Sequence, residues 1–307
     1  MTSGMIPGVT EGIARLAATR EELLEAIAIR HEAFERTNPL VEFQAARLAS
    51  RREHRAATWV LDRGDGTLVS TLLCYAFNLS VGGRIVAAYG LGSVGTRKAH
   101  RRKGYAAALC LAAIEESERV GRRVGLLYAA IAPAYYERLG FRALPASGFR
   151  CDRLAELASS GEAATLAPVD PRSELERLVA DYAAFHEGLL HVHRGRSAFL
   201  RGLDEGSDEW FFRVDGAERG YVRASLERDG SVTLCEAVLL DPALLAPALR
   251  GLARFAADSG RKALTGWIEP PAELGGLLLP APRDHDLPML RGEPIESAVA
   301  LWPSDHF

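Results

Sequence analysis

Five of the seven residues from Arg97 to Lys103 are arginine or lysine, and the next residue is Gly104. An apolar segment, 84–96, precedes this basic turn, and the apolar run 106–114 after it has the composition of a buried helix. A glycine lets the backbone approach a ligand closely, and the free N–H groups of a helix N-terminus favour an anion. Arginine and lysine add charge-assisted hydrogen bonds to phosphate oxygens. The segment therefore predicts a pyrophosphate-binding turn.

Two other interpretations of the basic turn stay open at this point. It can be a solvated surface turn, or it can be a patch that binds nucleic acid. The sequence has no G-x-x-x-x-G-K-[ST] pattern. Its G-x-G-x-x-G at 90–95 lies inside the apolar segment 84–96 and not between a strand and a helix, so the other common phosphate-binding loops are not indicated.

The segments downstream of the turn help to choose among these three interpretations of it. Residues 120–123, Val-Gly-Arg-Arg, have the glycine and the cations typical of a helix end. The nearly continuous apolar run 124–132 predicts a strand buried on both faces. Pro133 then begins a short helix that ends at Gly140, and residues 136–141 read Tyr-Glu-Arg-Leu-Gly-Phe.

Two of these motifs resemble those of the GNAT (Gcn5-related N-acetyltransferase) superfamily. The spacing Arg101-x-x-Gly104-x-Ala106 resembles its phosphate-binding signature, and 136–141 resembles a sequence that follows it in many members. The resemblance covers roughly residues 8–148 and implies acetyl-CoA as the acyl donor. It implies that the cofactor contacts Val94, Gly95, Thr96, Arg101, Arg102, Lys103, Gly104, Tyr105 and Ala106.

The resemblance also implies how the chemistry is divided. A backbone N–H of a splayed strand, within residues 94–96, would polarise the acetyl carbonyl, and Gly95 would let that strand bulge. Tyr136 matches the tyrosine that protonates the departing thiolate, whereas its neighbour Tyr135 is better suited to packing in the core. Position 129 holds alanine where many relatives have asparagine, which removes one expected cofactor contact.

The rest of the first half fits an α+β fold. Hydrophobic patterns predict strands at 12–17, 57–62, 68–78 and 84–96, and an amphipathic helix at 20–36. This order is that of the superfamily, a mixed and mostly antiparallel sheet flanked by helices.

The second half repeats this plan, with a helix at 175–186, three strands between 209 and 240, a helix at 242–258 and a strand at 263–268. We therefore expect an active GNAT domain at 8–150, a linker at 151–168 and a degenerate GNAT-like domain at 169–290. In place of the basic glycine turn, the second copy has Leu240-Asp241-Pro242. Asp241 is predicted to cap the helix, so its own carboxylate fills the anion site.

The tandem plan resembles the Eis-type acetyltransferases, which have a third domain for which this chain is too short. In those proteins the C-terminus returns to the first domain, and its carboxylate accepts a proton from the amine. The resemblance makes the carboxylate of Phe307, in an expected tail at 291–307, a candidate catalytic group. The alternative is a tail docked on its own domain, with Trp302 buried there.

Composition sets wider bounds. The 307-residue chain is 48% hydrophobic and 25% charged, which suits a soluble globular protein, and its net charge of −3 disfavours a general nucleic-acid binder. It has neither an eighteen-residue apolar run nor a signal-peptide pattern, so we expect a cytoplasmic protein without a membrane partner. No metal is expected, and four cysteines without ligand or disulfide spacing are predicted to be buried thiols: Cys74, Cys110, Cys151 and Cys235.

The sequence does not identify the general base. Five groups on or after the first long helix are candidates, although each is more typical of a solvated surface group: Glu32, Glu35, Glu42, His31 and His54. Three more histidines cluster without a partner cysteine or carboxylate, which favours exposed helix-end residues over a zinc site: His186, His191 and His193.

The favoured interpretation is an acetyl-CoA-dependent N-acetyltransferase that acts on a small-molecule amine or a protein lysine, and a homo-oligomer is compatible with it. A non-catalytic acyl-CoA sensor or scaffold is the main alternative, and a nucleic-acid adaptor is the third. The tyrosine motif at 136–141 favours the enzyme, but no residue pattern names the acceptor.

Overall fold

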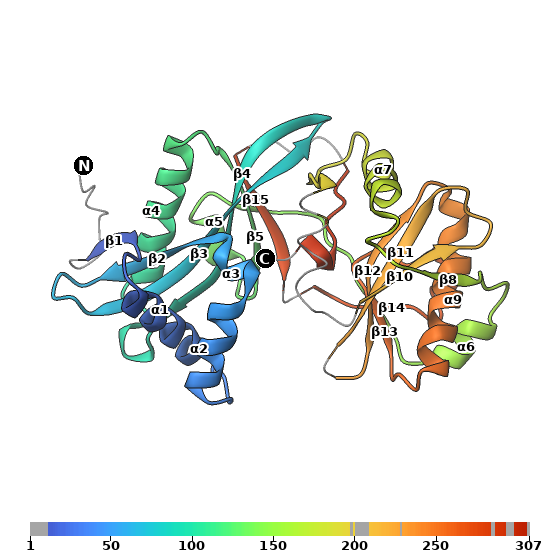
Figure 1. Ribbon diagram of the computed structural model, residues 1–307, viewed down its shortest axis with the longest axis horizontal. Helices are drawn as coiled ribbons and strands as arrows, with labels where there is room; N and C mark the ends of the chain where they lie inside the picture. Colours follow the sequence, from blue (N-terminus) through green and yellow to red (C-terminus); the bar gives the residue numbers. More distant parts are fainter. Residues whose placement is uncertain are drawn as a thin grey trace.

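The computed structural model describes residues 12–196, 199, 209–227, 229–283, 286–292 and 298–305. Its strands form two mixed sheets, each flanked by helices, which lie next to each other along the long axis of the molecule (Figure 1). The predicted α+β fold is confirmed.

The first sheet has the order β1-β2-β3-β4-β5-β15-β6, and a short strand, β9, also pairs with β3. Its strands are β1 (Ile13–Leu16), β2 (Ala56–Asp62), β3 (Leu68–Val81), β4 (Arg84–Thr96), β5 (Val124–Ala129), β6 (Arg142–Ala143), β9 (His191–Val192) and β15 (Leu287–Arg291). The helices of this half are α1 (Arg20–Ala33), α2 (Leu40–Ala49), α3 (Arg51–His54), η1 (Lys98–His100), α4 (Tyr105–Arg119) and α5 (Ala134–Glu137). The sequence predicted the longer strands and helices of this half but not α2, α3, β9 or β15.

The second sheet has the order β14-β7-β13-β12-β11-β10-β8. Its strands are β7 (Phe149–Cys151), β8 (Leu166–Val169), β10 (Glu209–Val214), β11 (Gly220–Leu226), β12 (Val232–Leu239), β13 (Leu264–Gly266) and β14 (Leu279–Pro280). The helices here are α6 (Leu154–Ser159), α7 (Leu175–Phe185), η2 (Pro242–Leu244), α9 (Leu245–Asp258), η3 (Ala272–Leu274) and η4 (Pro303–Asp305).

The two sheets have the same layout when they are traced from β1 and from β8. In each, the fourth and fifth strands run parallel, β4 with β5 and β12 with β13, and every other neighbouring pair is antiparallel. A helix, α4 or α9, connects the parallel pair, as parallel strands require a crossover. The sixth strand of each sheet comes from the other half of the chain, because β15 joins the first sheet and β7 joins the second.

This exchange corrects two predicted boundaries. Residues 151–168, predicted to be a linker, contribute the last residue of β7, all of α6 and most of β8. Residues 287–290, predicted to close the second domain, lie in β15 of the first sheet, and Arg291 of the predicted tail is the last residue of that strand. A short strand carries no local signal of which sheet edge it will pair with, so the sequence pattern missed both.

Each sheet has its own hydrophobic core. Leu109 of α4 packs in a cluster with Leu127 of β5, and Leu249 of α9 packs in another with Leu234 of β12. Of the cysteines, Cys110, Cys151 and Cys235 are buried and Cys74 is half-buried. Within the described residues, no helix is both long and apolar enough to cross a membrane.

Candidate active site

The predicted phosphate turn connects β4 to α4. Gly104 precedes the first residue of α4 with a φ of 82°, a left-handed conformation that glycine adopts without steric cost, and Arg102 is also left-handed with a φ of 62°. Among the described residues, no side chain caps this helix N-terminus. Its first N–H groups are therefore available to an anionic ligand.

The cations of the turn divide into two sets. Arg97 forms ion pairs with Glu25 and Glu32, and the Lys98 backbone N–H donates to Glu32 at 2.6 Å. These contacts hold the turn against α1, as does the bond from Arg101 Nη2 to the Ala33 carbonyl at 2.9 Å. Two further cations, Arg102 and Lys103, extend into solvent beside the helix N-terminus.

The candidate bases on α1 and after it have other partners or lie in solvent. Glu32 is held by Lys98 and Arg97, and these contacts lower the pKa of its carboxyl group. Glu35 is exposed and 3.2 Å from Lys98 Nζ, and Glu42 is also exposed. His31 and His54 hydrogen-bond through Nε2 to the carbonyls of Asn38 and Leu48.

The strand β4 has a bulge, but not where it was predicted. The β3–β4 register passes from Gly92 opposite Leu73 to Gly95 opposite Thr71, so β4 contains one extra residue here. Ser93 has the left-handed φ of 51°, whereas Gly95 is regularly paired. A Cβ at Gly95 would lie 3.0 Å from the Ala33 Cβ, so this glycine permits close packing of β4 on α1.

The bulge coincides with the place where two strands separate. The parallel pairing of β4 with β5 covers Ala88 to Leu91, whereas β4 continues to Thr96. The β4 backbone beyond Leu91 therefore faces a gap in the sheet, where its N–H groups can donate to a ligand. The predicted role of residues 94–96 concerns the backbone of this same stretch of β4.

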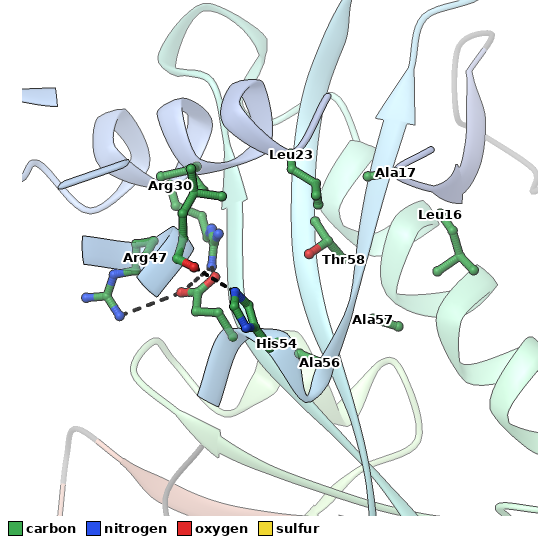
Figure 2. Close-up of a pocket in the computed structure, with 12 residues that line it drawn as sticks. Leu16, Ala17, Leu23, Arg30, Arg47, His54, Ala56, Ala57 and Thr58 are labelled. Atoms are coloured by element: carbon green, nitrogen blue, oxygen red, sulfur yellow. Dashed lines mark hydrogen bonds and ion pairs between the residues drawn. The ribbon is translucent and has the colours of Figure 1, made fainter. Parts of the chain in front are cut away.

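A cavity of about 360 Å³ opens beside the bulge. It is bounded by Gly92 and Ser93 of β4, by Tyr128 and Ala130 at the end of β5, and by side chains of α1 to α3. A second cavity of about 390 Å³ shares three lining residues with it, Arg30, Arg47 and Glu53. Figure 2 shows this second cavity, with Arg30, Arg47 and His54 at one end and Leu16, Ala17 and Ala57 at the other.

Glu53 is a site residue that the sequence analysis missed. Arg30 Nη1 lies 2.7 Å from Glu53 Oε2, and Arg47 Nη1 lies 3.6 Å from Oε1 (Figure 2). Glu53 is on α3, and a four-residue helix is too short to show a hydrophobic period. The charged run Arg-Arg-Glu-His at 51–54 was the only local signal.

Tyr136 and Tyr135 lie together on α5. Their rings are perpendicular with centroids 5.0 Å apart, and burial raises the pKa of both hydroxyl groups above the usual range. Tyr136 is buried in the same cluster as Tyr105 of α4, and Ala129 is buried there too. Within the described residues, the Tyr135 hydroxyl has no hydrogen-bond partner.

The corresponding helix start in the second half is closed. The Asp241 carboxylate accepts a hydrogen bond from the Ala243 backbone N–H at 3.0 Å, and Pro242 is the first residue of η2, which leads into α9. The predicted cap is confirmed. A carboxylate of the chain occupies the position at which α4 leaves room for a ligand anion.

The C-terminal segment contacts both halves: Leu301 is buried in a cluster with Leu79 and Leu290 of the first sheet, and Trp302 packs in the core of the second half. The Trp302 Nε1–H donates to His186 Nε2 at 2.8 Å. Asp305 forms a buried ion pair with Arg194, which also pairs with Glu236 of β12. Phe307, the candidate terminal carboxylate, lies outside the described residues.

The sequence predicted exposed histidines at 186, 191 and 193, and this prediction is wrong. His186 and His191 are buried with ring centroids 4.8 Å apart, and His193 is half-buried. Burial lowers the pKa of His186 to about 4, and its Nδ1–H donates to the Tyr182 carbonyl. The His186 ring packs in the core beside Trp302.

Comparison with known proteins gives the class of the first half. The family model described as Acetyltransferase (GNAT) domain matches residues 16–144, so this part of the chain is a GNAT acetyltransferase domain. No curated protein matches the chain in sequence.

Solved structures extend the likeness of fold to most of the chain. A GCN5-related N-acetyltransferase from Kribbella flavida is 18% identical, with a TM-score of 0.69 over 92% of this chain and 71% of its own. Eis1 from Mycobacterium abscessus is also 18% identical, with a TM-score of 0.58 over 92% and 73%. A putative acetyltransferase from Pyrococcus horikoshii is 14% identical, with a TM-score of 0.60 over 100% and 99%. At these identities the likeness establishes the fold alone.

Proposed function

We propose that the protein is an acetyl-CoA-dependent N-acetyltransferase with one active site per chain, built on the first sheet. One observation carries the proposal, the succession of an open strand and an open helix start. The bulged strand β4 borders a cavity, and the helix that follows it, α4, begins without a side-chain cap after the left-handed Gly104. The helix N-terminus would hold the pyrophosphate, with Arg101, Arg102 and Lys103 beside it. The thioester would then extend along β4 to the gap before β5.

Acetyl transfer at this gap needs three contributions. The backbone N–H groups of residues 94–96 would hold the carbonyl oxygen as negative charge develops on it. The amine nitrogen loses one proton to solvent, attacks the carbonyl carbon and forms the C–N bond as the C–S bond breaks. Tyr136 would give its proton to the departing sulfur. The second proton that the nitrogen loses would return to the Tyr136 oxygen through solvent, which restores the hydroxyl.

The burial of Tyr136 is consistent with this role. A tyrosine hydroxyl is protonated at neutral pH even at its ordinary pKa, and burial raises the pKa of Tyr136 further, so the group carries its proton when a thiolate forms beside it. The second sheet would then be a degenerate GNAT-like unit, since Asp241 occupies its helix N-terminus.

A thiol-release assay tests the proposal. The protein is mixed with acetyl-CoA and a panel of primary amines, and free CoA is measured together with the acetylated product. We expect CoA release that depends on the amine. Acetyl-CoA binding without turnover on any amine would instead support the non-catalytic sensor, and no acetyl-CoA binding would contradict both.

A further inference from the structure

The cavity beside the β4 bulge has an unusual set of charges for a pocket that receives an amine. Among the described residues that line it are three arginines, Arg30, Arg36 and Arg47, and two carboxylates, Glu53 and Asp286. A cationic amine substrate would gain little from a pocket in which arginines outnumber carboxylates. The charges therefore point to an acceptor that also carries a negative group.

The arginines are held in place by the protein. Arg47 lies over the Phe43 ring with its guanidinium carbon 4.9 Å from the ring centroid, and Arg36 lies over Phe34 at 5.9 Å. A guanidinium stacked on a ring keeps its edge N–H groups available for a carboxylate. These two side chains come from α2 and from the segment that follows α1.

Arg30 is the buried arginine among the three. It is only 3% exposed, and its Nη1 is engaged by Glu53, but within the described residues its Nε has no hydrogen-bond partner. A buried donor without a partner is costly, and a ligand oxygen would satisfy it. The Glu53 carboxylate neutralises the charge of one arginine, and its ion pair with Arg30 fixes the orientation of the Arg30 guanidinium.

Asp286 lines the side of the cavity that is opposite in charge to the arginine side. Its backbone N–H donates to the Ala129 carbonyl at 3.0 Å, which places it at the end of β5, where the β4–β5 gap begins. The cavity therefore has arginines toward α1 and α2 and a carboxylate toward the gap where the thioester would lie. A charge pattern of this kind matches a molecule with an amine at one end and an anion at the other.

We propose that the acceptor is a carboxylate-bearing primary amine, of which a free α-amino acid is the simplest case. Its ammonium group lies toward Asp286 before deprotonation, and its carboxylate is bound by Arg36, Arg47 and the Nε of Arg30. This inference rests on the proposed acetyl transfer and specifies the substrate class of the same site.

Matched acceptors test the charge requirement. Each α-amino acid in a panel is compared with its own amide, which has the same side chain and amine but no negative charge. The amine of the amide loses its proton more easily, so chemistry alone favours the amide. We expect at least one amino acid to be acetylated with a kcat/KM about 10-fold or more above that of its amide.

Two variants test whether the requirement for a negatively charged acceptor arises from the arginines of the cavity. Arg36→Gln and Arg47→Gln each raise the KM for the amino acid by about 10-fold, leaving the KM for the amide and the acetyl-CoA affinity unchanged. Arg119→Gln is the matched control, since it removes an exposed arginine at the far end of α4 and leaves all of these values unchanged.

The outcomes separate this inference from the proposed function. Amides acetylated as well as the acids, or acetyl-CoA bound with no acid acetylated, would overturn the substrate class and leave the acetyl-CoA site standing. An Arg36 or Arg47 variant that loses acetyl-CoA affinity would also overturn it, because the arginines would then serve the cofactor. A wild-type protein that does not bind acetyl-CoA would contradict the proposed function itself.

Discussion

The two sheets differ at the bulge of the fourth strand and at the start of the helix that follows this strand. In the first sheet, the bulge at Ser93 faces a cavity, and α4 begins at an uncapped glycine. In the second sheet, the register of β12 also shifts by one residue, at Cys235, but Glu236 beside it is fully buried among ion pairs. The same strand layout thus leaves space in one half and closes it in the other.

The groups that close the second half come from several parts of the chain. Arg194 and Arg223 bind Glu236 directly, and Ser304 of the C-terminal segment donates to it at 2.6 Å. Asp241 closes the helix start independently. A buried carboxylate needs such partners to remain charged, and its pKa is held at about 2 by the two arginines despite burial. The second sheet thus has a buried, charge-paired carboxylate where the first sheet has a cavity.

The largest expected effect concerns the open helix start. Gly104→Val should weaken acetyl-CoA binding by about 100-fold or more, because a side chain and a strained φ would disturb the turn that approaches the phosphates. Calorimetric titration measures the affinity. Gly121→Val is the control, since Gly121 has a similar φ of 86° at the other end of the same helix, with open space around its Cβ position. Equal affinities in the two variants would count against the site.

The next effect concerns the proposed acid. Tyr136→Phe should keep acetyl-CoA affinity but lower kcat by about 10²–10⁴-fold, the usual range for losing a general acid. Tyr135→Phe, the neighbouring change on α5, should be milder. Single-turnover kinetics isolates the chemical step, and wild-type rates in the Tyr136 variant would remove this residue from the mechanism.

The third prediction concerns the pH dependence of stability that His186 gives to the second half. The folded protein keeps His186 neutral down to about pH 4, whereas the unfolded chain protonates it near 6.5. The unfolded state therefore binds more protons at this site in this window, so the contribution of His186 to stability should fall by about 3 kcal/mol as the pH drops from 6.5 to 4. Chemical denaturation at each pH measures the slope. His186→Gln retains an acceptor for Trp302 without titrating, and a slope as steep as that of wild type would contradict the assignment.

The smallest effect concerns the closed helix start. Asp241→Ala should cost about 1 kcal/mol of stability, the usual worth of an N-cap, whereas Asp241→Ser keeps a capping oxygen and should cost less. Neither change should create a second acetyl-CoA site, because no basic glycine turn precedes η2. Equal stability of the two variants would show that the cap contributes nothing.

The regular elements were predictable because their patterns are local. The bounds of β4 and β10, the end of α4 near Arg119 and the Asp241 cap all follow from hydrophobic periodicity and from capping residues. The basic turn was predicted to bind phosphate from equally local evidence, since its cations and glycine are contiguous, and that role stays a prediction.

The features that sequence reasoning missed depend on contacts between distant segments. Gly95 was predicted as the bulge because glycine tolerates unusual backbone, but its close contact with Ala33 is set by the packing of α1, and the bulge formed at Ser93. The five residues of β15 have an ordinary strand composition that does not indicate the first sheet. Glu53 became a cavity residue only because α3 brings it to Arg30.

The central claim is that each chain has one acyl-CoA site, in the first sheet. Isothermal titration of the wild-type protein with acetyl-CoA, repeated on Gly104→Val and on Asp241→Ala, tests it most directly. The account predicts one site per chain in the wild type and in the Asp241 variant, and affinity lowered by about 100-fold or more in the Gly104 variant. Two equivalent sites per chain, or wild-type affinity in Gly104→Val, would contradict it.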